Sequence, residues 1–314
     1  MKNQSLSILF LGAGKRVSLL KSFIKASKEL KINLKMYSYE LDNYQPISKH
    51  AKIIVGEKWS SRNLENDLLK VIEKYKIQLL VSNSDPATLC HSKLRTVHEA
   101  AKNVSPIDKV NTCLSKNIFQ KYCELNFLPI IPKAEEDEFP CFAKPAIGSA
   151  SKGIRLILTK DEKKKFLKNQ TEDFIFQKYI DGTEYTVDAY ISNAKKICVI
   201  SPRVRLSTSG GESVISQTIN NEYIVKMSKD IINKLDLIGP VTIQFIQDKF
   251  NKKFYLMEVN PRLGGAVLAS IEAGYNIPKI MLQDATNLKT DIILKGKEIL
   301  MKRYFMEEYY ETNN

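Results

Sequence analysis

The sequence predicts an α/β region with a parallel sheet, followed by a longer α+β region with antiparallel sheets. Short apolar runs alternate with helical patterns in the first third of the chain, which is typical of βαβ units. Further along, closely spaced apolar runs separated by turn residues favour hairpins. The 314 residues are enough for two or three lobes, each with its own core.

The first region is expected to contain strands and helices in alternation. Strands are predicted at 7–11, 34–39 and 78–83, and helices at 17–30 and 64–75. Ser-Pro and Asp-Lys pairs around 104–111 indicate a boundary. We therefore expect a first domain at 1–108 and a second at 109–314.

The second region is expected to begin with a helix at 115–126 and a proline-punctuated acidic stretch. Strands are then predicted at 141–145, 154–158, 174–179, 184–191 and 196–203. The pattern continues with a helix at 222–235, a hairpin within 241–259, closing helices, and a last strand near 303–308.

Composition argues against several classes of function. The net charge of +13 comes from scattered lysines rather than an arginine-rich stripe, so we expect no nucleic-acid partner. No apolar run is long enough to span a bilayer, and the apolar start of the chain has no cleavage site, so a cytoplasmic location without a membrane partner is expected. Five cysteines without a CxxC pair, and three histidines, make a zinc site or a disulfide framework improbable.

Gly12 and Gly14 follow the first predicted strand, where glycines permit a tight turn into a helix. A dinucleotide fingerprint requires a third glycine, and Val17 stands at that position. An acidic residue, Glu40 or Asp42, does follow the second strand. An oxidoreductase therefore remains an alternative hypothesis.

The last predicted hairpin carries the strongest chemical signal. If its turn is centred near Asn251, Gln244 lies opposite Glu258 and Thr242 lies opposite Asn260. Side chains on one face of a strand recur every second residue, so three side-chain oxygens converge. One carboxylate with two amide oxygens suits magnesium or manganese. The alternative is a solvated polar face, which the Pro-Arg and Gly-Gly pairs after the hairpin disfavour.

A second element combines Lys144, at the end of a predicted strand, with the small-residue loop at 148–153. Small residues allow successive backbone N–H groups to surround an oxyanion, and a lysine adds a point charge for phosphate. The ending of a Walker loop and the helix after it are missing. By itself this element is better explained by a flexible surface hairpin.

A third element is the extended segment that ends in Gln177, Lys178, Tyr179 and Ile180, followed by Glu184. Such a segment can offer backbone groups to an adenine edge, and the glutamate can accept hydrogen bonds from ribose hydroxyls. A strand and turn with one exposed glutamate is the simpler alternative.

In this order and at these spacings, the three elements resemble the ATP-grasp superfamily, especially its carbamoyl-phosphate-synthetase-like branch. The resemblance covers the whole chain, because the first region is similar to the Rossmann-like pre-ATP-grasp domain of those proteins. It implies an ATP-grasp fold in which two antiparallel sheets clamp ATP, with a lid subdomain at about 135–182.

The resemblance also implies roles for single residues. The implied nucleotide contacts are Lys116, Lys144, Gly148, Ser149, Ser151, Lys152, Gly153, Gln177, Lys178, Tyr179, Ile180 and Glu184. The implied metal ligands are Gln244, Glu258 and Asn260. Arg262 would face the transferred phosphate, while Arg203, Arg205 and the run 210–213 would border the acceptor site.

Some residues depart from the family pattern. Gln177 stands where a glutamate is common. Gln244 stands where many relatives have a carboxylate, although carbamoyl-phosphate synthetases also use glutamine there, and a neutral ligand is expected to weaken a second metal. Gly265 occupies the place of a further synthetase arginine, so carbamoyl phosphate is a doubtful product. The chain is too short for a full synthetase large subunit, and the bicarbonate-site histidine of biotin carboxylases has no evident counterpart.

We therefore expect a ligase that uses ATP and Mg²⁺ or Mn²⁺ to activate a carboxylate as an acyl phosphate, which an amine then attacks with release of ADP and phosphate. The assigned residues all handle phosphate or metal, so such a site works by positioning and charge neutralisation. Small-molecule carboxylates and amines are the expected partners, and a homodimer is a possible assembly. The alternatives are a small-molecule kinase, a carbamoyl-phosphate-synthetase-like subunit and a catalytically silent nucleotide-binding module.

Overall fold

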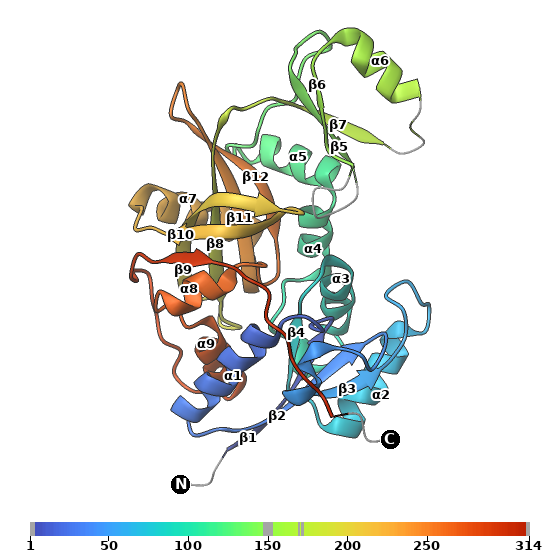
Figure 1. The fold of residues 1–314 in the computed structure, drawn as a ribbon, viewed down its shortest axis with the longest axis vertical. Coiled ribbons are helices and arrows are strands. Elements are labelled where there is room, and N and C mark those ends of the chain that lie inside the picture. Colours follow the sequence, from blue (N-terminus) through green and yellow to red (C-terminus); the bar gives the residue numbers. More distant parts are fainter. Residues whose placement is uncertain (1–3, 147–152, 169, 171–172, 312–314) are drawn as a thin grey trace.

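The computed structural model describes residues 4–146, 153–168, 170 and 173–311. In this part of the chain the strands form a four-stranded, a six-stranded and a three-stranded sheet. Figure 1 shows the four-stranded sheet at the bottom, the three-stranded sheet at the top and the six-stranded sheet between them. None of the helices in the described ranges combines the length and apolarity needed to cross a bilayer.

The N-terminal sheet is parallel, as the sequence predicts, with the order β3-β2-β1-β4. Its strands are β1 (Ser5–Leu11), β2 (Asn33–Glu40), β3 (Lys52–Val55) and β4 (Leu79–Ser82). Its helices are α1 (Val17–Glu29), α2 (Leu64–Tyr75) and α3 (Asp85–Leu94), with α4 (Ile107–Leu114) following. Strand β1 is buried from its second residue onward, which explains its continuous apolar sequence.

Of the strands and helices just given, β3, α3 and α4 are absent from the sequence prediction. Strand β3 has four residues, none of them buried, so it lacks the periodic signal of a longer strand. Helix α3 begins at Asp85 and Pro86, directly after Ser84. Proline in the first turn is a helix-start signal that hydrophobic periodicity alone does not detect.

The six-stranded sheet is antiparallel and has the order β12-β11-β8-β9-β10-β13. Its strands are β8 (Gly182–Ile191), β9 (Ile197–Ser209), β10 (Glu212–Thr218), β11 (Gly239–Asp248), β12 (Phe254–Asn260) and β13 (Leu300–Lys302). Helix α7 (Glu222–Leu235) packs its apolar side chains in one core cluster with Val241, Ile243 and Phe245 of β11. The alternate residues of β11 therefore face away from this core.

The prediction of a last strand near 303–308 is wrong. Strand β13 ends at Lys302, and no further strand is present in residues 303–311. Strand β13 pairs with β10, and the last pair is Lys302 with Ile215. Just beyond this pair, between Ser213 and Ile215, β10 has a register shift in its pairing with β9. An aromatic-rich segment forms a strand only where a regular partner is available, because a bulge disrupts the ladder.

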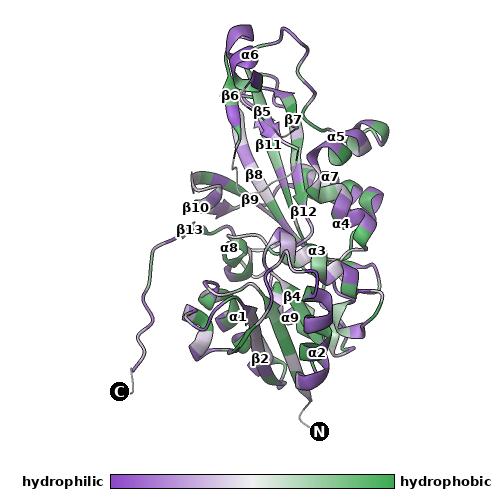
Figure 2. Cartoon of the chain, turned by 90° about the vertical axis from the view of Figure 1, so that its right-hand side faces the viewer, coloured by the Kyte–Doolittle hydropathy of each residue, from purple (hydrophilic) through white to green (hydrophobic). Residues whose placement is uncertain are grey.

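The three-stranded sheet has the order β6-β5-β7, with β5 (Cys141–Pro145), β6 (Arg155–Ile157) and β7 (Phe174–Lys178). Helix α6 (Lys160–Lys168) covers one face of it through Phe166, and the rest of this helix is largely hydrophilic (Figure 2). The other face carries Phe142, Lys144, Ile175 and Gln177. Helix α5 (Lys116–Leu125) lies below this sheet (Figure 1).

One hydrophobic cluster joins the N-terminal region to the end of the chain. It contains residues of β1 and α1 together with residues of α8 (Val267–Glu272) and α9 (Ile277–Ala285). The cluster therefore contains residues from both sides of position 108, the domain boundary expected from the sequence. Apolar burial is the main favourable contribution to packing, so the two regions support one another.

We expect the Gly239→Ala variant to be strongly destabilised. Gly239 has φ +80°, and a Cβ atom there would lie 2.1 Å from the backbone oxygen of Asn103. A positive φ costs about 1–3 kcal/mol for a non-glycine residue, and the contact with backbone adds to this. Urea denaturation of both proteins measures the loss in free energy of unfolding.

Gly210→Ala is the matched control, because Gly210 has φ +56° and no atom lies within 4 Å of its would-be Cβ. Equal losses in the two variants would contradict the importance of the contact with Asn103.

Candidate functional site

A cavity of about 730 Å³ lies between the three-stranded and six-stranded sheets and reaches the start of α3. It is lined by residues of α3, α5, β5, β7, β8, β9, β11 and β12. Its volume is within the range of small-molecule sites. The cavity is therefore the candidate site, and the predicted site residues are located relative to it below.

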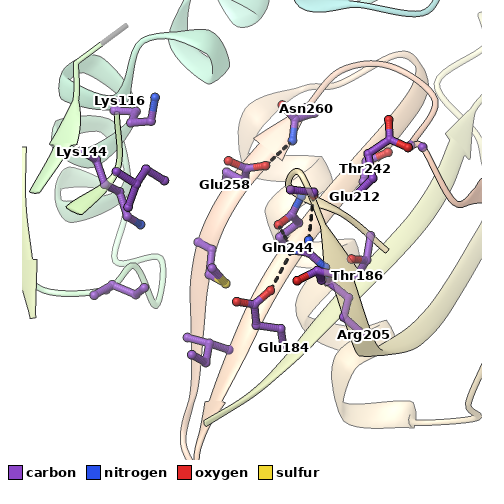
Figure 3. Close-up of a pocket in the computed structure, with 18 of the residues that line it drawn as sticks. Lys116, Lys144, Glu184, Thr186, Arg205, Glu212, Thr242, Gln244, Glu258 and Asn260 are labelled. Carbon is purple, nitrogen blue, oxygen red and sulfur yellow. Dashed lines mark hydrogen bonds and ion pairs between the residues drawn. The ribbon is translucent and has the colours of Figure 1, made fainter. Parts of the chain in front are cut away.

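The predicted register of the β11–β12 hairpin is confirmed. Gln244 pairs with Glu258, and Thr242 pairs with Asn260. All four residues line the cavity, and Figure 3 shows them on the same wall. Asn260 Nδ2 donates to Glu258 Oε1 at 2.8 Å. The described residues contain no cluster of three or more histidines, cysteines or carboxylates suited to a metal. The candidate metal ligands on this wall are therefore one carboxylate and two amide side chains.

Lys116 and Lys144 face this wall from the other side of the cavity (Figure 3). Lys116 is the first residue of α5, and Lys144 lies on β5. Burial lowers the pKa of both ammonium groups, and attraction to Glu258 opposes the shift. Two partly desolvated cations favour an anion between them and the hairpin.

Arg205 on β9 joins three segments of the cavity wall. Its Nη1 atom donates to Gln244 Oε1 at 2.9 Å and lies 2.7 Å from Glu184 Oε2. Its Nη2 atom donates to the carbonyl oxygen of Gly211 at 2.8 Å. The predicted acceptor-site arginine is thus in contact with a predicted metal ligand and with the predicted ribose ligand.

A family model described as "ATP-grasp in the biosynthetic pathway with Ter operon" matches residues 170–304. This segment contains the β11–β12 hairpin and Arg205. This part of the chain is therefore similar to ATP-grasp proteins.

Curated relatives belong to the carbamoyl phosphate synthases. The arginine-specific large chain of Bacillus subtilis is 28% identical over 174 residues, which are 50% of this chain and 17% of the relative. The large chain of Sulfurisphaera tokodaii is 25% identical over 199 residues, which are 54% of this chain and 19% of the relative. The matches therefore span less than a fifth of the length of these relatives.

Solved structures share the fold at low identity. N5-carboxyaminoimidazole synthetase from Staphylococcus aureus, complexed with ADP, has a TM-score of 0.74 at 15% identity and covers 96% of this chain and 82% of its own. An L-amino acid ligase from Bacillus licheniformis has a TM-score of 0.71 at 16% identity and covers 91% and 74%.

The other residues implied by the ATP-grasp resemblance have different surroundings. Gln177 is buried, and its Nε2 donates to Gln120 Oε1 at 2.7 Å. Lys178 pairs with Glu138, and the Tyr179 ring packs against Phe142. These residues and Ile180 all line the cavity.

The predicted lid loop is only partly described. Gly148, Ser149, Ser151 and Lys152 lie outside the described residues. Gly153 is described, has φ +74° and is not among the lining residues.

The Pro-Arg-Leu-Gly-Gly loop, residues 261–265, contacts the N-terminal region. Arg262 Nε lies 2.6 Å from Asp85 Oδ1, at the start of α3. Arg16 Nη1 donates to the carbonyl oxygens of Gly264 and Gly265, both at 3.2 Å. Sequence reasoning missed Arg16 and Asp85 as parts of the site. The one available signal was the position of Arg16 directly after the Gly12–Gly14 turn.

Gly265 of this loop lies close to the end of the Glu212 side chain. A Cβ atom there would lie 2.9 Å from the carboxyl carbon of Glu212, which pairs with Arg303 at 2.6 Å. The missing synthetase arginine would therefore meet the Glu212 side chain.

The N-terminal glycines do not contribute to the cavity. Glu40 Oε1 accepts hydrogen bonds from the Ala13 amide at 2.8 Å and from Ser38 Oγ at 2.5 Å. Asp42 accepts from its own turn, from the Tyr44 amide and Gln45 Nε2. Both carboxylates stabilise local loops, which disfavours the oxidoreductase hypothesis.

Arg203 lines the cavity and forms a buried ion pair there. Its Nε lies 2.9 Å from Asp188 Oδ2, and both side chains are 3% exposed or less. Ser270 Oγ donates to the same oxygen at 2.7 Å, and Arg203 Nη1 donates to Ser213 Oγ at 3.3 Å. The Arg203–Asp188 pair therefore connects β8, β9, β10 and α8, and sequence reasoning missed Asp188 as the partner of Arg203.

We expect Asp188→Asn to reduce the free energy of unfolding by about 3–5 kcal/mol, because it leaves the Arg203 guanidinium buried without its counter-charge. Asp230→Asn, in the exposed Lys234–Asp230 pair of α7, is the control, with an expected loss below about 1 kcal/mol. Urea denaturation measures both. Similar losses would show that burial of the Arg203 pair is not what makes it important.

Proposed function

We propose that the protein is an ATP- and Mg²⁺-dependent carboxylate–amine ligase. The observation that carries the proposal is the arrangement of one cavity wall with Gln244, Glu258 and Asn260, faced by Lys116 and Lys144. Oxygen donors on one side and ammonium groups on the other fit a metal-bound polyphosphate.

The donor set fits a hard divalent cation. Carboxylate and amide oxygens without histidine or thiolate are the ligands that Mg²⁺ and Mn²⁺ prefer. Glu258 and Asn260 would hold the ion, with Gln244 beside them. When bound, the ion supplies charge neutralisation at the phosphate oxygens.

The other lining residues fit the remaining parts of ATP. Residues 177–180 and Glu184 line the cavity, and in the proposed complex the backbone of 177–180 would bind the adenine edge while Glu184 would accept hydrogen bonds from the ribose hydroxyls. Lys116 and Lys144 would bind the phosphates, and the two antiparallel sheets would clamp the nucleotide.

The domains 1–108 and 109–314 remain proposed units, and the homodimer and the cytoplasmic location remain predictions.

The proposed reaction has two steps. A carboxylate oxygen of the substrate attacks the γ-phosphorus of ATP, the bond to the ADP oxygen breaks, and an acyl phosphate forms. An amine then attacks the acyl carbon, loses a proton, and expels phosphate to leave a C–N bond. Arg262 pairs with Asp85 and lines the cavity, and in this proposal its guanidinium would neutralise charge on the transferred phosphoryl group.

The name of one similar structure, L-amino acid ligase, favours ligation over simple phosphate transfer. A screen of carboxylates and amines by ADP release tests the proposal. Release that requires both substrates is the expected result. Phosphate transfer without any amine would identify a kinase, and ATP binding without turnover across the panel would identify a silent nucleotide-binding module.

We expect Glu258→Gln to lower the rate of ADP release at least about 100-fold. Substitution of residues that only hydrogen-bond to a metal ligand typically lowers metal affinity or activity about 10- to 100-fold, and this change removes the charge of a proposed ligand itself. Calorimetric titration of Mn²⁺ with a non-hydrolysable ATP analogue should show a matching loss of metal affinity. The control is Glu272→Gln on the exposed side of α8. Unchanged turnover in Glu258→Gln would overturn the assignment of the metal site.

A further inference from the structure

We propose that the Arg205 guanidinium takes the place of a second divalent cation, so that the protein binds one metal ion per nucleotide. This inference rests on the proposed function and deepens it. It concerns the number of ions and the role of Gln244, which the donor set alone leaves open.

The first argument is the position of the guanidinium. Arg205 Nη1 lies between Gln244 Oε1 at 2.9 Å and Glu184 Oε2 at 2.7 Å. Figure 3 shows these contacts on the hairpin wall, separate from the Glu258–Asn260 contact. A positive charge is therefore built into the wall between the proposed ribose ligand and one of the three proposed metal ligands.

The second argument is that this charge is held in place. The Arg205 side chain is 9% exposed, and its Nη2 atom also donates to Gly211 O at 2.8 Å. The three acceptors come from β8, β11 and the turn between β9 and β10. A planar guanidinium bonded in several directions loses little further conformational freedom on binding a phosphate, so it is preorganised as a cation.

The third argument is the charge of the ligands. Among Gln244, Glu258 and Asn260 only Glu258 is anionic, and two dications sharing one carboxylate would repel each other strongly at short range. Gln244 Oε1 already accepts from a cation, which repels a dication approaching the same oxygen. Glu258 and Asn260, which contact one another, remain as ligands for a single ion.

The alternative is that Arg205 only braces the empty wall and moves away when the nucleotide binds. Gln244 would then be available as a ligand, and two ions could bind. The two cases differ in a quantity that does not depend on the unknown substrates: the number of Mn²⁺ ions bound per nucleotide.

The experiment counts Mn²⁺ by electron paramagnetic resonance of the free ion, with the full chain saturated with a non-hydrolysable ATP analogue. We expect one Mn²⁺ per bound nucleotide in the wild type. Arg205→Gln keeps a side chain that can hydrogen-bond but removes the charge, and we expect two. Arg205→Lys keeps a positive charge, and we expect one.

Two ions in the wild type, or one ion in Arg205→Gln, would overturn the inference. If Arg205→Gln fails to fold, as judged by its thermal melt, the wild-type and Arg205→Lys counts still decide, because two ions in either contradicts the proposal. Nucleotide binding with two ions leaves the proposed function standing. Absence of nucleotide binding in the wild type would overturn the proposed function as well.

Discussion

The site depends on the antiparallel register of β11 and β12. Val241, Ile243 and Phe245 of β11 pack in one core cluster with α7, so the alternate residues of that strand must face the cavity. Pairing across the ladder then places Glu258 beside Gln244. A slip of one residue would turn the polar side chains into the core and the apolar ones into the cavity. Burial of the apolar face thus holds the oxygen donors in place.

The cavity also depends on contacts between distant parts of the chain. Helices α8 and α9 pack against β1 and α1, and this shared core brings the Pro-Arg-Leu-Gly-Gly loop to the N-terminal region. Arg262 then meets Asp85, and Arg16 meets two carbonyl oxygens of the loop. The first region is therefore part of the site, since it supplies groups that hold the loop beside the hairpin.

Charges around the cavity fall into two kinds. Arg203, Arg205 and Arg262 each contact a carboxylate, which compensates the loss of hydration. Burial lowers the pKa of Lys144 despite its attraction to Glu258. An anion in the cavity would therefore stabilise the charged form of this ammonium group. The three arginines therefore belong to the hydrogen-bonded frame of the cavity wall.

The sequence by itself determined the features that depend on near neighbours in the chain. The parallel N-terminal sheet, helices α2 and α7, and the pairing of Gln244 with Glu258 follow from periodicity and from a turn only a few residues long. The lysine at the end of β5 was found in the same way. Only the tertiary structure decided the partners of the arginines, because Arg262 and Asp85 are 177 positions apart and no local pattern links them. It also decided that residues 303–308 form no strand, since a strand requires a regular partner as well as suitable residues.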